Sequence, residues 1–204
     1  MTGKYGLRLR LRAAMLAAVI CGTAGLTTPA GATTLIRMGL EDLVASNSTI
    51  VVGEVLAVES RWNEDATFIV TDVRFAASDV LKGRLAEPEF TVTLPGGKIG
   101  NRAHLVIGAA ELTPGNSYVL FLSRMNLMGA GEALAVRDLI QGAFDIRMDK
   151  DGLRAVSQAL RHPLMPDKSG QALPPGAEKG MLVNTMLSEI RQIAARQGSR
   201  REVK

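Results

Sequence analysis

One stretch, residues 67–84, constrains the fold of this chain more than any other: TFIVTDVRFAASDVLKGR. From Ile69 to Phe75, β-branched and aromatic residues alternate with charged ones, which predicts a strand with one buried face. The alternation stops at Ala76-Ala77-Ser78, where we expect the coil or bulge that a small barrel needs to turn a corner. The stretch ends at Lys82-Gly83, where glycine is free to take a positive φ and end the strand.

Residues 33–160 as a whole are predicted to form one mainly β domain. Short strands alternate with turns rich in glycine and proline, which is typical of a small antiparallel barrel or a sandwich. A glycine inside the first strand suits a bulged strand, and the DKDG sequence at 149–152 predicts a tight hairpin turn. The six to eight expected strands lie in residues 49–62, 67–84, 89–97, 102–112, 118–124, 132–139, 142–148 and 153–157.

Two helices are expected around these strands. In residues 38–48 the apolar side chains have helical spacing, and two acidic residues stand in the first turn, where the helix dipole favours them. Residues 161–178 are rich in proline and glycine and are predicted to be an exposed linker. Residues 179–204 predict an amphipathic helix with a basic tail, which either docks on its own domain or binds a partner.

The first 32 residues have the pattern of a secretory signal peptide. A basic segment is followed by an apolar run of about 14 residues, shorter than the roughly 20 that a spanning helix needs. Ala30-Gly31-Ala32 resembles a signal-peptidase site. We therefore expect export to the periplasm or the cell exterior, with no membrane span in the mature chain.

Removal of residues 1–32 changes how the composition is interpreted. Four of the 24 basic residues and none of the 20 acidic residues lie there, so the remaining chain carries 20 of each. Its aromatic residues lie mostly in apolar strands rather than beside Lys and Arg, so nucleic acid is not expected as a partner. The single cysteine, Cys21, leaves with the leader, so no disulfide is expected in the exported protein.

Few residues suit catalysis or metal binding. The chain has two histidines, His104 in a weak strand and His162 in the linker. No nucleotide, metal or hydrolase motif accompanies them, so we expect no enzyme activity, catalytic residue, metal or cofactor. An enzyme alternative would require His104 to cluster with an acid such as Glu111.

Trp62 is the aromatic residue best placed for binding. It stands beside Arg61 where a strand meets a turn, and it is either a cover over the end of the barrel or a contact residue on a binding rim. The glycine-rich loop at 95–101 contains Gly96, Gly97 and Lys98 but lacks the spacing of a phosphate-binding loop. These four residues are our candidate protein-binding positions in the domain.

The order of motifs resembles the netrin-like domain, best known from the tissue inhibitors of metalloproteinases. The matching segments lie within residues 38–124: a short helix leading into a Val/Ile-rich strand, then FIVTDVRFAASDVLKG, EFTVTLPGG and LTPGNSYVLFLSR. A similar layout occurs in uncharacterised exported bacterial proteins. The resemblance implies a five-stranded OB-type barrel.

The resemblance also implies a possible activity. In the inhibitor family, a cysteine at the mature N-terminus chelates the zinc ion of the protease. Here cleavage after Ala32 would leave Thr33 and Thr34 at the N-terminus, whose free amine can chelate but is not held by a disulfide. Our main hypothesis is thus a non-enzymatic module that binds an envelope or secreted protein; inhibition of, or assistance to, a secreted zinc metalloprotease is the alternative.

Overall fold

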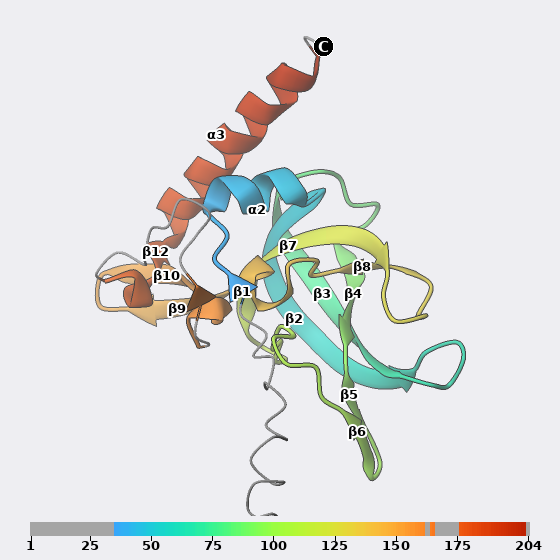
Figure 1. The fold of residues 1–204 in the computed structure, drawn as a ribbon. Helices are drawn as coiled ribbons and strands as arrows, with labels where there is room; N and C mark the ends of the chain where they lie inside the picture. Colours follow the sequence, from blue (N-terminus) through green and yellow to red (C-terminus); the bar gives the residue numbers. More distant parts are fainter. Residues whose placement is uncertain (1–34, 162–163, 166–175, 203–204) are drawn as a thin grey trace, which may run out of the picture. The chain divides into compact units, whose positions relative to one another are not determined.

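The structure is a computed structural model that describes residues 35–161, 164–165 and 176–202, all within one unit of residues 34–204 (Figure 1). The predicted signal peptide, Thr33, Thr34, His162 and most of the predicted linker lie outside the described residues. In chain order the elements are β1 (Leu35–Ile36), α2 (Leu40–Ser46), β2 (Thr49–Trp62), β3 (Ile69–Lys82), β4 (Glu89–Pro95), β5 (Gly97–Ile99), β6 (Arg102–His104), β7 (Ser117–Asn126), β8 (Glu132–Ala135), the 3₁₀ helix η1 (Leu139–Gly142), β9 (Ala143–Asp149), β10 (Gly152–Ser157), η2 (Gln158–Arg161), β11 (Leu164–Met165), η3 (Ala177–Lys179), β12 (Met181–Leu182) and α3 (Val183–Glu202).

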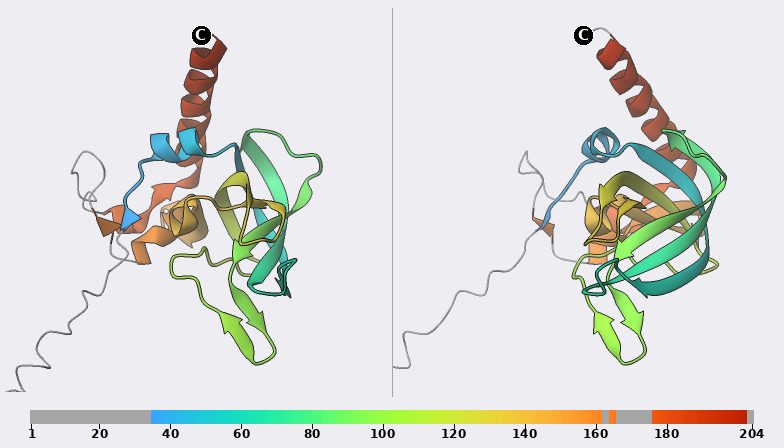
Figure 2. Two further views of the ribbon diagram at one scale, coloured as in Figure 1. Left: turned by 45° about the vertical axis from the view of Figure 1, so that its right-hand side comes forward. Right: turned by 90° about the vertical axis from the view of Figure 1, so that its right-hand side faces the viewer.

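The fold is mainly β, as predicted, and is built on one antiparallel sheet. Its strand order is β12-β10-β9-β7-β2-β3-β4, and β8 pairs with β7. The strands β2, β3 and β4 curve strongly (Figure 2), and β4 comes to lie next to β8. The strand pairs of the described residues include none between β4 and β8, so the sheet is not closed into a barrel by hydrogen bonds.

The long β2–β3 hairpin is bent by bulges where the sequence predicts a corner. The pairing register shifts between Val52 and Gly53, so that Ser78 is the extra residue on β3, and the Ser78 hydroxyl donates to the carbonyl of Val52 at 3.2 Å. A side chain at Gly53 would collide with the carbonyl oxygen of Ala76. The predicted break at Ala76-Ala77-Ser78 is therefore confirmed as a bulge, and glycine is needed opposite it because the two backbones approach closely.

The Lys82-Gly83 corner ends β3 and also fixes α2. Gly83 has a φ of +81°, the predicted positive value. The Lys82 ammonium donates to the carbonyl of Val44 and, at 2.7 Å, to that of Asn47. These carbonyls lie at the C-terminal end of α2, where a cation is favoured by the helix dipole and satisfies acceptors that the helix leaves open.

Two apolar clusters lie on the two faces of the curved sheet. The first fills the concave side with residues such as Val73, Phe75 and Leu120. The second lies between the sheet and the two helices, and it includes Ile50 and Phe121. The α3 helix contributes the following buried residues to it: Val183, Met186, Ile190 and Ile193. The first part of the C-terminal helix thus docks on its own domain, while its last turns extend past α2 (Figure 1).

Some predicted strands are shorter than expected. The segment 102–112 is a strand only over β6, because its partner β5 is three residues long and Gly108 then turns the chain with a φ of +83°. The segment 132–139 is a strand only to Ala135. The DKDG turn joins β9 and β10 as predicted, and two described parts of the predicted linker are ordered, as β11 and η3.

Candidate interaction site at the β5–β6 hairpin

The β5–β6 hairpin projects from the end of the sheet beyond β4 (Figures 1 and 2). Hydrogen bonds fix its base on β3: the Gly96 N–H donates to the carbonyl of Ile69 at 3.0 Å, and the Thr71 hydroxyl donates to that of Gly96 at 2.7 Å. On β2, the Ser60 hydroxyl accepts the N–H of Lys98 at 3.3 Å. The candidate residues Gly96 and Gly97 therefore form the base of the hairpin, and Lys98 begins its exposed part.

An aromatic cluster lies at this base. The ring of His104 stacks on Phe68, with 4.8 Å between the ring centroids, and meets Trp62 edge to face at 5.9 Å. The guanidinium carbon of Arg102 lies 5.8 Å from the centroid of the Trp62 ring. The structure therefore brings Trp62 together with β6, the strand that pairs with the 95–101 loop; the sequence pattern had given Trp62 and this loop as separate candidates.

The turn between β2 and β3 positions Trp62 and Phe68. The side-chain oxygen of Asn63 accepts the N–H groups of Thr67, at 2.8 Å, and Phe68, at 3.0 Å. Its amide nitrogen donates to the carbonyl of Met128 at 2.8 Å, and the residue is buried. Asparagine commonly closes turns through such bonds, and here it holds Phe68 next to the strand end that carries Trp62.

His104 has a structural role in the described residues. Its Nδ1 accepts the backbone N–H of Ile69 at 2.9 Å, so this nitrogen is unprotonated. Glu111 belongs to a different network, because its carboxylate accepts from Arg161 at 2.8 Å and its backbone groups bond to Gln158. The described residues contain no group of three or more His, Cys, Asp or Glu side chains that could hold a metal. The hydrogen bond to Ile69 and the contacts with Phe68 and Trp62 explain the position of His104 by packing. The enzyme alternative stays a prediction.

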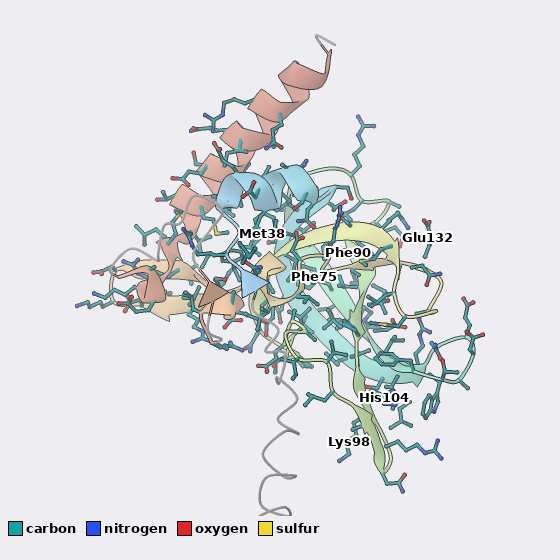
Figure 3. All side chains as sticks on the ribbon, viewed as in Figure 1. Met38, Phe75, Phe90, Lys98, His104 and Glu132 are labelled. Atoms are coloured by element: carbon teal, nitrogen blue, oxygen red, sulfur yellow. The ribbon has the colours of Figure 1, made fainter. Side chains whose placement is uncertain are left out.

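Two exposed aliphatic side chains follow His104. The fractional exposure of Leu105 is 90%, and that of Ile107 is 81%. Lys98 on β5 and Arg102 on β6 are also exposed, and Figure 3 shows Lys98 on the projecting hairpin. We call this surface the hairpin rim and define it by these residues: Trp62, Phe68, Lys98, Arg102, His104, Leu105 and Ile107.

Five members of the hairpin rim were not predicted from the sequence as binding residues: Phe68, Arg102, His104, Leu105 and Ile107. Phe68 could be predicted from the sequence, because pairing Trp62 with the start of the next strand places Phe68 across the turn from Trp62. Leu105 and Ile107 were assigned to a strand, where their spacing predicts burial of both on one face. They are exposed because β6 ends before them.

The alternative of protease inhibition depends on Thr33 and Thr34, which lie outside the described residues. No family model and no curated protein matches the chain. The resemblance to the netrin-like domain therefore stays a hypothesis.

None of the described helices is long and apolar enough to cross a membrane.

Proposed function

We propose that this chain is an exported, non-enzymatic interaction module that binds a protein of the cell envelope or the cell exterior through the hairpin rim. One observation carries the proposal: Leu105 and Ile107 are almost fully exposed in the segment that directly follows His104, whose ring meets the half-buried Trp62. Neighbouring large apolar side chains on a surface cost free energy in water, and they commonly mark interaction sites.

The composition of the hairpin rim favours a protein partner. Tryptophan and arginine are enriched among residues that dominate binding energy, and here Arg102 lies over the face of Trp62. Leu105 and Ile107 supply apolar area, while Lys98 and Arg102 add positive charge at the edge. A partner surface with an apolar pocket and acidic residues around it would complement this arrangement.

The scaffold that presents the hairpin rim is, in this proposal, an OB-type barrel of the netrin-like kind. Two observations support this: the strong curvature of β2, β3 and β4, and the position of β4 next to β8. The hairpin then extends one strand end of the barrel outward. In this geometry the loops at that end present the binding residues without disturbing the core.

The experiment is capture of partners from envelope and culture-supernatant fractions, followed by affinity measurement with the captured protein after purification. The test variant is Leu105→Ser combined with Ile107→Ser. Because both side chains are exposed, the thermal unfolding midpoint should stay unchanged while the affinity falls at least tenfold. The proposal fails if the variant binds the partner as tightly as the wild type.

A matched control comes from another hairpin. Met148 and Leu153 are a cross-strand pair on β9 and β10, with exposed fractions of 75% and 48%. Replacing both with serine removes a similar exposed apolar pair and should leave partner affinity unchanged. Equal loss of affinity in both double variants would indicate nonspecific hydrophobic adsorption. It would contradict specific binding of the partner at the hairpin rim.

A further inference from the structure

An apolar cavity of about 370 Å³ lies on the opposite side of the sheet from the concave cluster. Its walls come from the segment before α2, from β9 and β10, and from the start of α3. Met38, Leu43, Phe144 and Met186 line it, and Figure 3 shows Met38 beneath α2. Small-molecule sites typically enclose about 300–1,000 Å³ and have mainly apolar walls, so the size and the lining suit a ligand.

The polar groups of the cavity wall have different roles. Gln141 is buried, its side-chain oxygen accepts the N–H of Met38 at 2.8 Å, and its amide nitrogen donates to the carbonyl of Ile36 at 3.1 Å. It thereby fixes the segment that carries Arg37. Arg37 is the one cationic side chain among the described residues that line the cavity. A guanidinium has five N–H donors, so it can contact a ligand carboxylate in addition to protein groups.

We propose that this cavity binds a long-chain fatty acid, with the acyl chain between α2, α3 and the sheet and the carboxylate at Arg37. Charge complementarity argues for this occupant, since a cationic residue in the wall of a mainly apolar site suits an anion with an apolar chain. The methionine side chains, including Met181 and Met186, are unbranched and adapt to a flexible chain. This site is separate from the hairpin rim and does not depend on the proposed function.

Binding is measured by titrating the purified full chain with cis-parinaric acid, a fluorescent fatty acid, and displacing it with palmitate. We expect one saturable site per chain. Removing two methylenes from the competitor should weaken it about tenfold, because each buried methylene contributes to affinity. Hexadecanol, which has no charge, should compete less well than palmitate.

Two kinds of variant locate the site. Ala177→Trp places a large side chain at a half-exposed position of the cavity wall, and Ala159→Leu fills it from a buried position; each should lower probe affinity at least tenfold. Arg37→Gln should remove the preference for palmitate over hexadecanol, whereas Arg74→Gln, at an exposed position on β3, should preserve it. If Ala159→Leu does not fold, Ala177→Trp decides the question.

The result that overturns the proposal is equally specific. It is wrong if the probe does not bind, or if it binds with unchanged affinity to a folded Ala177→Trp variant. It is also wrong if the Leu105→Ser/Ile107→Ser variant loses the probe, since the fatty acid would then occupy the hairpin rim. Unchanged probe binding by that variant is the expected outcome and leaves the two sites independent.

Discussion

Gly53 occupies a position on β2 where a side chain does not fit, because an added Cβ would collide with the carbonyl of Ala76 and the ring of Phe75. We predict that Gly53→Ala lowers the free energy of unfolding by about 1–3 kcal/mol, through strain in the bulged hairpin. Denaturant unfolding measures the change. Gly198→Ala is the matched control: its Cβ meets open space on α3, so the variant should gain about 0.5–1 kcal/mol. Equal changes in the free energy of unfolding at Gly53 and Gly198 would contradict the claim that the close approach of the β2 and β3 backbones requires glycine at position 53.

Lys82 joins the end of β3 to the C-terminal end of α2 through the carbonyls of Val44 and Asn47. Lys82→Met keeps the aliphatic stem and removes the donor, and it should cost about 1–3 kcal/mol because these bonds are charge-assisted. Thermal unfolding gives the measurement. Lys98→Met, at an exposed hairpin position, should leave the unfolding midpoint unchanged. An unchanged unfolding midpoint for Lys82→Met would show that these two bonds do not contribute to the stability of the fold.

At the residue scale, the sequence predicted what depends on local chemistry. The break at Ala76-Ala77-Ser78 and the positive φ of Gly83 follow from residue type and strand pattern. The contacts of Lys82 do not, since its acceptors lie about 35 residues earlier in the chain. The stacking of His104 on Phe68 could not be predicted from the sequence either, because it depends on where β4 ends and the β5–β6 hairpin begins.

The docking of α3 is the main feature at the element scale. Met186 and Ile190 are 2% and 0% exposed, and they pack with residues of β2 and β7. Ile190→Ala should therefore cost about 2–5 kcal/mol, the usual range for a fully buried truncation. The same change at the exposed Gln192 should be nearly neutral. If Ile190→Ala unfolds like the wild type, the helix does not contribute to the stability of the sheet.

The periodicity of residues 179–204 predicted the helix but left its partner open, because an apolar stripe does not identify the surface that it covers. Salt bridges of Arg191 with Asp79 and of Arg196 with Glu41 now place the helix beside β3 and α2. The β strands were predicted well where burial alternates along them. They were overextended at 102–112 and 132–139, where pairing partners end early and periodicity alone gives no boundary.

For the whole molecule, the charge balance and the proposed location depend on removal of the first 32 residues. We predict that the exported protein begins at Thr33, because Ala30 and Ala32 provide the small residues that signal peptidase requires. Intact mass measurement of the exported chain checks the site. Ala32→Phe should block cleavage and leave the larger mass, whereas Thr34→Ser should be processed normally. A mature protein that retains Cys21 would contradict the assignment.

Topology was the part of the whole molecule that the sequence predicted least completely. The antiparallel, mainly β class followed from strand spacing. The order that places β9, β10 and β12 beyond β7 did not, since it depends on which strand edges remain free after β2 pairs with both β3 and β7. The hairpin rim and the apolar cavity both depend on this arrangement.

The position of α3 also has a consequence for synthesis of the chain. The apolar face formed by Ile50, Val119 and Phe121 is complete long before the ribosome makes Met186 and Ile190, which cover it. At about 5–20 residues per second, that face stays open to water for several seconds. A chain that stops before residue 183 would keep it open permanently and be prone to aggregation and proteolysis. The solubility of the domain therefore depends on synthesis and docking of α3.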